Sequence, residues 1–226
     1  MRDLATRPDL LIENALTTWD GSADPEQLQY GQLVMEEGLL LRRQARLISA
    51  DLAIVEVGSY TGKSACCLGV GSREGFGAPV YAVDMWWSGT SRKGRNFKTH
   101  VKGEPQGSSK FHWPEVLAVF QHRLEAFHLT DVVRPTMGAS ATVAATFDKP
   151  IGLLHIDAEH TYEGCKADFE AWSPKVSPHG WVALHDYANK PDGADGVRRY
   201  IDGEVLAAGG WRIVASAGSM VVLCRV

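Results

Sequence analysis

Acidic and histidine side chains follow two apolar segments of the chain. The segment IGLLHIDAEH contains Asp157 and, three residues later, His160, and the segment GWVALHD ends in His185 and Asp186. Apolar runs of this length are typical of strands buried on both faces, and carboxylates rarely end such strands without a partner. Asp157, His185 and Asp186 therefore form a candidate site for a divalent metal ion.

The residue types limit which metal such a site would hold. Two carboxylates completed by water suit Mg²⁺ or Mn²⁺, which prefer oxygen ligands. An imidazole ligand from His185 would shift the preference toward Mn²⁺, Fe²⁺ or Zn²⁺. His155 alternates with Asp157 along the same segment, so its ring either faces this site or lies in the interior.

A glycine-containing turn, EVGSYTGKS at residues 56–64, is the second candidate site. Gly58 lets the chain turn sharply after an apolar run, Gly62 lets the backbone approach a ligand, and Ser64 stands at the start of a helix whose N–H groups attract an anion. Asp84 ends the next apolar run, where a carboxylate can accept both hydroxyls of a ribose. This pattern predicts a site for a nucleoside that carries an anionic group.

Three ligands of this kind remain in view. A nucleoside triphosphate would need a loop one residue longer between Gly58 and the Gly-Lys pair, although IGLLHID could supply a magnesium aspartate. A nicotinamide dinucleotide would need a glycine where Tyr60 stands. S-adenosylmethionine has no phosphate, so the bulk of Tyr60 is acceptable, and its carboxylate can bind at the helix start.

The elements that must position these residues alternate between strand and helix patterns, which predicts a mainly parallel sheet with helices on both faces. The C-terminal stretch, with a small turn at Ala217 and Gly218, predicts an antiparallel hairpin. The predicted fold is α/β, Rossmann-like and doubly wound, with a seven-stranded sheet and an N-terminal helical extension. Strand patterns cover residues 52–58, 78–84, 131–138, 151–157 and 180–186, and helix patterns cover 25–50 and 62–69.

These patterns divide the chain into an N-terminal helical extension, residues 1–50, and one ligand-binding domain, residues 51–226. Within that domain, residues 86–113 are too long for an ordinary loop and predict a lid or a substrate-binding loop. This segment is rich in arginine and lysine and contains one acidic residue, Glu104, so it could attract an anionic substrate.

Composition excludes several classes of protein. The formal net charge of −4 and the pI of about 6.1 speak against a nucleic-acid partner. The sequence has neither an apolar run that could span a membrane nor the apolar core of a signal peptide. We expect a cytoplasmic protein without a membrane partner, and a homodimer is a further expectation.

Two short motifs resemble those of a known family. The stretch EVGSYTGKS resembles the first motif of class I methyltransferases of the catechol and caffeoyl-CoA type, with Glu56, Gly58, Tyr60, Gly62 and Ser64 in the matching places. The stretch MGAS, which ends in Gly138, Ala139 and Ser140, resembles the adenine-binding segment of the same enzymes. The likeness is closest to a bacterial branch that includes macrocin-type and cephalosporin-cluster O-methyltransferase-like proteins.

The resemblance implies a function and a set of residues. It implies an S-adenosylmethionine-dependent, metal-dependent O-methyltransferase that acts on a small hydroxylated molecule, with bacterial specialised metabolism as the expected setting. His160 stands where the family has a lysine base, and Asp157 would contact both the cofactor and the metal. Asp84 would bind the ribose, and Met85 and Trp86 follow it, with Trp86 placed to pack against the adenine. The rival functions are a nucleoside-triphosphate-binding ATPase or switch and a non-catalytic S-adenosylmethionine-binding protein.

Overall fold

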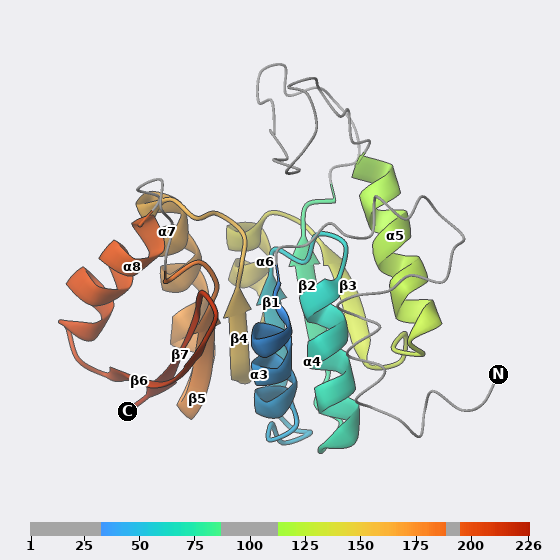
Figure 1. The fold of residues 1–226 in the computed structure, drawn as a ribbon, viewed down its shortest axis with the longest axis horizontal. Helices are drawn as coiled ribbons and strands as arrows, with labels where there is room; N and C mark the ends of the chain where they lie inside the picture. Colours follow the sequence, from blue (N-terminus) through green and yellow to red (C-terminus); the bar gives the residue numbers. More distant parts are fainter. Residues whose placement is uncertain (1–32, 87–112, 189–194) are drawn as a thin grey trace.

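A computed structural model of the protein describes residues 33–86, 113–188 and 195–226 (Figure 1). The predictions made for residues 1–32 and for the lid or substrate loop at 87–112 lie outside the described residues.

The described residues form one seven-stranded sheet with the strand order β3-β2-β1-β4-β5-β7-β6. The first five of these strands are parallel, and β7 runs antiparallel to both β5 and β6. This arrangement confirms the predicted fold class, including the C-terminal hairpin. The strands are β1 (Ala53–Val57), β2 (Val80–Asp84), β3 (Val133–Met137), β4 (Ile151–Ile156), β5 (Val176–Leu184), β6 (Trp211–Ala217) and β7 (Met220–Arg225).

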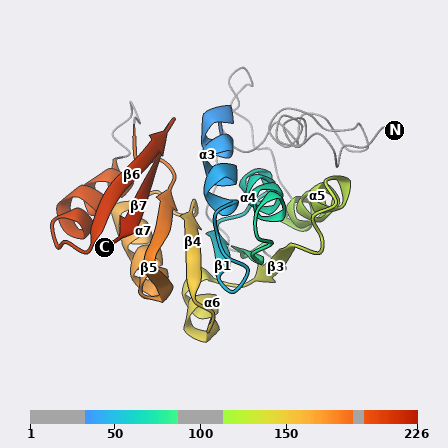
Figure 2. The same cartoon turned by 90° about the horizontal axis from the view of Figure 1, so that it is seen from below.

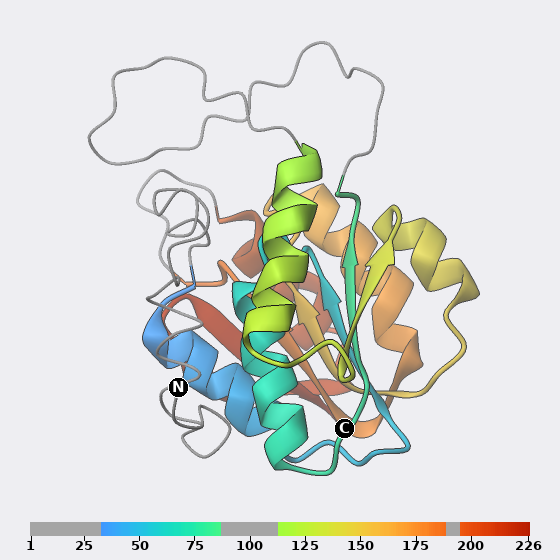
Figure 3. The same ribbon diagram turned by 90° about the vertical axis from the view of Figure 1, so that its right-hand side faces the viewer.

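Helices cover both faces of the sheet, as the continuous apolar strands require (Figures 2 and 3). One core lies between the sheet and α3, α4 and α5, and a second core lies between the sheet and α6, α7 and α8. Every residue of β1 and of β4 is buried, because both strands contribute side chains to both cores. The helices are α3 (Met35–Ala45), α4 (Lys63–Glu74), α5 (Trp113–Ala126), α6 (Ser140–Thr146), α7 (Tyr162–Trp172) and α8 (Gly196–Tyr200), with the single turn η2 (Ser173–Lys175) and the π-helical turn η3 (Ile201–Leu206).

Helix α4 continues beyond the predicted boundary at residue 69. Glycine usually weakens a helix. Gly71 within α4 and Gly75 at its C-cap nevertheless allow the helix to pack closely. A side chain at Gly71 or Gly75 would collide with the backbone carbonyl groups of Arg42 and Arg46, so these glycines let α3 lie directly against α4. The predicted N-terminal helix is shorter than expected in the described region, because α3 ends at Ala45 and residues 46–50 form turns.

In the described part of the chain, no helix is long and apolar enough to cross a bilayer.

The turn after β1 depends on the absence of a side chain at Gly58. Gly58 has a φ of +89°, and a Cβ there would meet the Asp157 carbonyl and Ala158 closer than real Cβ contacts allow. Gly77 also has a positive φ, +74°, but nothing lies within 4 Å of its absent Cβ.

We expect Gly58→Ala to destabilise the protein by more than the roughly 1–2 kcal/mol that a left-handed conformation alone costs. Gly77→Ala is the matched control, since it adds the backbone strain without the collision. Urea denaturation of both variants measures the difference in free energy of unfolding. Equal losses would mean that the turns after β1 and β4 do not pack as closely as described.

Candidate active site

The carboxyl ends of β1, β4 and β5 meet at one edge of the sheet. The Asp157 backbone N–H donates to the Val57 carbonyl at 2.9 Å, and the His185 N–H donates to the Ile156 carbonyl at 3.1 Å. These bonds continue the parallel ladder one step past each strand, so the polar residues that follow β4 and β5 stand side by side.

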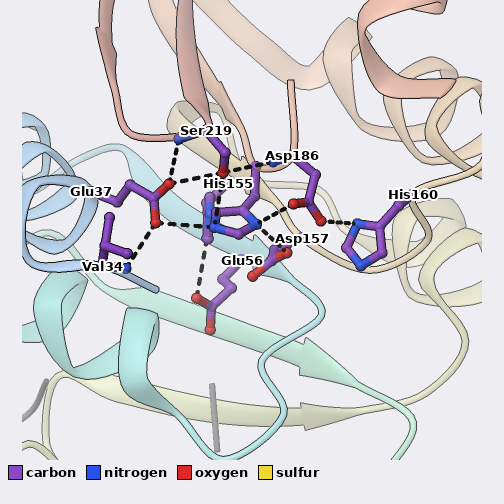
Figure 4. A network of polar contacts seen from close by, with 9 residues as sticks. Val34, Glu37, Glu56, His155, Asp157, His160, Asp186 and Ser219 are labelled. Carbon is purple, nitrogen blue, oxygen red and sulfur yellow. Dashed lines mark hydrogen bonds and ion pairs between the residues drawn. The ribbon is translucent and has the colours of Figure 1, made fainter. Parts of the chain in front are cut away.

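Two carboxylates and two imidazoles gather at this edge (Figure 4). Nδ1 of His185 lies 3.2 Å from Oδ1 of Asp157 and 3.6 Å from Oδ1 of Asp186. On the other side of Asp186, its Oδ2 lies 2.8 Å from Nδ1 of His160. The structure therefore brings together all four residues that the sequence placed in the metal site and the base position.

His185 is enclosed by carboxylates, and its side chain is only 4% exposed. Its Nε2 lies 3.1 Å from Oε2 of Glu37, whereas its buried Nδ1 makes no well-directed hydrogen bond within the described residues. Burial opposes protonation of the ring, but the surrounding carboxylates outweigh burial and raise the pKa of His185 to about 12. Without a bound cation, the imidazolium itself neutralises part of the carboxylate charge.

His160 is more exposed than His185. Its side chain is 41% exposed, and it contacts Asp186. One ligand atom from each of Asp157, His160 and Asp186 lies within 4.8 Å of the others, which is close enough for a shared metal ion. The carboxylate pair thus has an imidazole on each side, one buried and one open to solvent.

The backbone at Asp186 has a left-handed conformation, with a φ of 58°. Aspartate tolerates this region better than most residues, yet such outliers are uncommon and gather at functional sites. The Asp186 N–H donates to Oγ of Ser219 at 3.3 Å, so the turn between β6 and β7 supports this conformation.

His155 lies in the interior, the second of the two orientations left open by the sequence. It is fully buried and pairs with Glu56 across β4 and β1, at 3.2 Å from Nδ1 to Oε1. Glu56, which was expected near the cofactor, is also fully buried within β1. The pair links the two strands beneath the site.

Hydrogen bonds to the Asp84 carboxylate hold the glycine turn in place. The Tyr60 N–H donates to Oδ2 of Asp84 at 2.8 Å, and the Trp86 N–H donates to Oδ1 of the same carboxylate at 2.9 Å. Gly62 has a φ of +85° and caps α4, and the space beside it is filled by Phe120, 2.7 Å from where a Cβ would lie. Packing against α5 is therefore a reason for glycine at this position, which differs from the expected approach of a ligand.

Trp86 does not lie where the sequence suggested. Its side chain is 1% exposed, its ring packs against Phe120 at a centroid distance of 4.7 Å, and its Nε1 donates to the Tyr60 carbonyl. The expectation that Trp86 packs against an adenine is wrong, because the indole is part of the core. Met85, at 38% exposure, is the more accessible of the two residues.

The MGAS stretch forms the turn between β3 and α6. The Gly138 N–H donates to the Asp84 carbonyl at 3.0 Å, so this turn is next to the end of β2, and Ala139 precedes the first residue of α6. Oγ of Ser140 accepts from Nε1 of Trp172, which ties α6 to α7. Ser64, the second residue of α4, is buried.

Three residues of this region were missed by sequence reasoning. Ser59 is buried in the glycine turn, and its Oγ has no partner among the described residues. Glu37 and Ser219 reach the site from α3 and from the β6–β7 turn. Glu37 and Ser219 were missed because they are far in sequence from the other site residues. Ser59, in contrast, lies within the EVGSYTGKS motif.

The parallel strands place a glycine turn, the Asp84 carboxylate and a cluster of carboxylates and imidazoles at one end of an α/β sheet. A family of methyltransferase domains matches residues 55–187, which is more than half of the chain, so the chain belongs to this methyltransferase family. This membership confirms the predicted methyltransferase class and removes the ATPase or switch as a rival.

A curated relative and several solved structures are similar to the chain. The relative, the uncharacterized protein y4gI of Sinorhizobium fredii, is 30% identical over 134 residues, which are 59% of this chain and 13% of that protein. The chain therefore spans only a small part of that relative's length.

The solved structures share the fold at low sequence identity. The O-methyltransferase NovP has a TM-score of 0.60 at 19% identity, with 97% of this chain and 88% of NovP covered. The O-methyltransferase TomG from Streptomyces achromogenes, solved with S-adenosylmethionine, has a TM-score of 0.57 at 16% identity, covering 95% and 89%. An O-methyltransferase from Bacillus cereus, solved with S-adenosylhomocysteine, has a TM-score of 0.58 at 17% identity, covering 96% and 91%.

The charge on Glu37 predicts a pH-dependent stability. Burial disfavours its charged form, but hydrogen bonds to His185 and to backbone N–H groups outweigh burial and lower the pKa of Glu37 from 4.5 to about 2. Because the folded value lies below the unfolded one, this contribution is complete above about pH 4.5 and is lost as the pH falls toward 2.

In EDTA, we expect Glu37→Gln to flatten the decline of unfolding free energy between about pH 4.5 and 2. Glu36→Gln, which removes an exposed carboxylate from the same turn of α3, is the control and keeps the wild-type decline. Denaturant unfolding across this range measures both. Parallel pH profiles for Glu37→Gln and wild type would contradict the assignment.

Proposed function

We propose that the protein is an S-adenosylmethionine-dependent O-methyltransferase that uses a divalent metal ion to methylate a hydroxyl group of a small molecule. The observation that carries this proposal is the cluster of Asp157, Asp186, His185 and His160 beside the glycine turn. Family membership supplies the methyl transfer, and the cluster supplies groups that can hold a metal and remove a proton.

The cofactor site is proposed at the ends of β1, β2 and β3. The buried hydroxyl of Ser59 has no hydrogen-bond partner in the described part of the chain, so it is a polar group that a ligand could satisfy. Asp84 and the neighbouring Met85 lie beside the turn at Gly138, which fits a ribose and an adenine in that order. TomG and the Bacillus cereus enzyme, which have this fold, were solved with S-adenosylmethionine and S-adenosylhomocysteine.

For the metal, we favour Asp157, Asp186 and Nδ1 of His185 as ligands. Among the residues that the structure describes, the buried Nδ1 has no hydrogen-bond partner. It faces both carboxylates, and Glu37 lies at Nε2, an arrangement common for metal-binding histidines. Mg²⁺ and Mn²⁺ suit the carboxylates, and Fe²⁺ or Zn²⁺ would suit the imidazole. A bound divalent ion would lower the pKa of a coordinated hydroxyl and orient its oxygen.

His160 is proposed as the base. Its Nδ1 lies 2.8 Å from Oδ2 of Asp186, so Nε2 of this solvent-exposed side chain would be the nitrogen that accepts the substrate proton. The substrate hydroxyl would lose its proton to Nε2 as its oxygen bonds to the methyl carbon. The bond between this carbon and the sulfur of S-adenosylmethionine would break at the same time, and its electron pair would stay on sulfur.

We propose the methyl acceptor as a class of molecule and not as a particular compound. We propose a small hydroxylated molecule as the acceptor, and membership of the macrocin and cephalosporin-cluster branch, with a role in bacterial specialised metabolism, is part of the same proposal. Attraction of an anionic substrate depends on residues 87–112, which lie outside the described residues. The homodimer and the cytoplasmic location also stay predictions.

Ligand-dependent melting tests the cofactor. We expect S-adenosylmethionine and S-adenosylhomocysteine to raise the melting temperature, because a ligand that binds only the folded state stabilises it, whereas ATP should not. Each ligand is measured with Mg²⁺, Mn²⁺ or EDTA. Stabilisation by ATP alone would refute the proposal.

Replacing a proposed metal ligand tests the metal. Asp157→Asn should abolish metal-stimulated turnover while leaving affinity for S-adenosylmethionine nearly unchanged, because it removes a charged ligand with little change in size. Asp148→Asn, an exposed aspartate at the amino end of β4, is the control. Retention of metal-stimulated turnover in Asp157→Asn would rule out this ligand set.

Replacing the proposed base tests the proton transfer. We expect His160→Gln to lower kcat by about 10²-fold or more, the usual contribution of a general base, with little change in Mn²⁺ affinity. His128→Asn changes another exposed histidine, located before β3, and should leave kcat unchanged. Loss of Mn²⁺ binding in His160→Gln would instead make His160 a ligand.

A further inference from the structure

We infer that Glu37 and Ser219, which come from α3 and from the β6–β7 turn, are positioning residues that orient His185 toward the two carboxylates. The inference rests on the proposed metal-dependent function. It adds two residues that lie outside the segment matched by the methyltransferase family, residues 55–187.

Burial and polar contacts hold the Glu37 side chain in one position. Its side chain is 2% exposed, and its Oε2 accepts from the Val34 N–H at 2.9 Å and lies 3.1 Å from Nε2 of His185. Its Oε1 accepts from both the N–H and the hydroxyl of Ser219, at 2.7 and 2.8 Å. Four contacts on one buried carboxylate leave it little freedom to move.

The turn between β6 and β7 is shaped to receive this carboxylate. Gly218 has a φ of +54°, and a Cβ there would meet Oε1 of Glu37 at 2.5 Å, closer than real Cβ contacts. A side chain at this position would require the Glu37 carboxylate to move away from the turn. Ser219 also accepts from the Asp186 N–H and lies 3.4 Å from Nε2 of His185, so one hydroxyl reaches both residues.

The consequence for His185 is a fixed ring orientation. With Nε2 committed to Glu37, the other nitrogen, Nδ1, faces Asp157 and Asp186 (Figure 4). A carboxylate that accepts from the far nitrogen of a metal-binding histidine fixes the ring and commonly contributes 10- to 100-fold to metal affinity. Glu37 is not one of the proposed metal ligands, so its effect on the metal would act through His185.

The test uses the full chain and Mn²⁺, whose binding is followed by loss of the free-ion electron paramagnetic resonance signal. We expect Glu37→Gln to raise the Kd for Mn²⁺ by about 10- to 100-fold. The KM for Mn²⁺ should rise in parallel, while the calorimetric Kd for S-adenosylmethionine and the circular dichroism spectrum stay at wild-type values. Glu36→Gln is the matched control and should leave the Kd for Mn²⁺ unchanged.

The outcomes separate this inference from the proposed function. Wild-type protein that binds Mn²⁺, with Glu37→Gln and Glu36→Gln binding it equally well, would overturn the positioning role and leave the proposed function standing. Wild-type protein that binds no Mn²⁺ would overturn the metal dependence and the inference with it. If Glu37→Gln does not fold, Ser219→Ala decides: a higher Kd for Mn²⁺ supports the inference, and an unchanged Kd overturns it.

Discussion

The parallel pairing of β1, β4 and β5 determines where the candidate site residues lie. The register pairs Val57 with Ile156 and Ile156 with Leu184, so the next residue of each strand falls at the same level of the sheet. Those next residues are Gly58, Asp157 and His185. Because successive side chains on a strand point to opposite faces, a slip of one residue would turn the polar residues into the wrong core. Gly58, without a side chain, leaves room for the backbone after β4.

The electrostatic balance of the site follows from this placement. Glu37, Asp157 and Asp186 surround the His185 ring, and three carboxylates exceed the charge that one imidazolium can neutralise. Under the proposed function, a divalent ion bound at Nδ1 of His185 would replace a proton there and balance the excess carboxylate charge. His160, exposed and on the far side of Asp186, is separated from this exchange by a carboxylate.

The sequence was sufficient for features that depend on short stretches of chain. Apolar runs ending in Asp84, Asp157 and Asp186 placed the ends of β2 and β4 within one residue and that of β5 within two, because a strand buried on both faces has few other compositions. The predicted start of β5, residue 180, is too late, since Ser177, Pro178 and His179 are not buried and interrupt the apolar pattern. Gly71 lies within α4 because of its contact with α3, and no local pattern reveals such a contact.

Tertiary packing explains the features that were misjudged or missed. Trp86 follows the ribose-type aspartate, which suggested a ligand contact, but Phe120 of α5 provides a better apolar surface for the indole. Glu37 lies among apolar residues of an amphipathic helix and gives no sign that its partner is far along the chain. Single-sequence patterns describe faces and boundaries, whereas partners are chosen when the elements pack.

The contact between Glu37 and Ser219 joins residues that are 182 positions apart, across nearly the whole sheet domain. Contacts of such long range form late in folding, because closing a large loop costs conformational entropy that earlier, local contacts do not require. On the ribosome, α3 must wait for the β6–β7 turn to be synthesised before the Glu37 carboxylate has its full set of partners. A chain interrupted within β6 could hold the parallel strands and still lack an oriented His185. Completion of this one hydrogen-bonded junction would thus mark the moment at which the folded sheet becomes a finished site.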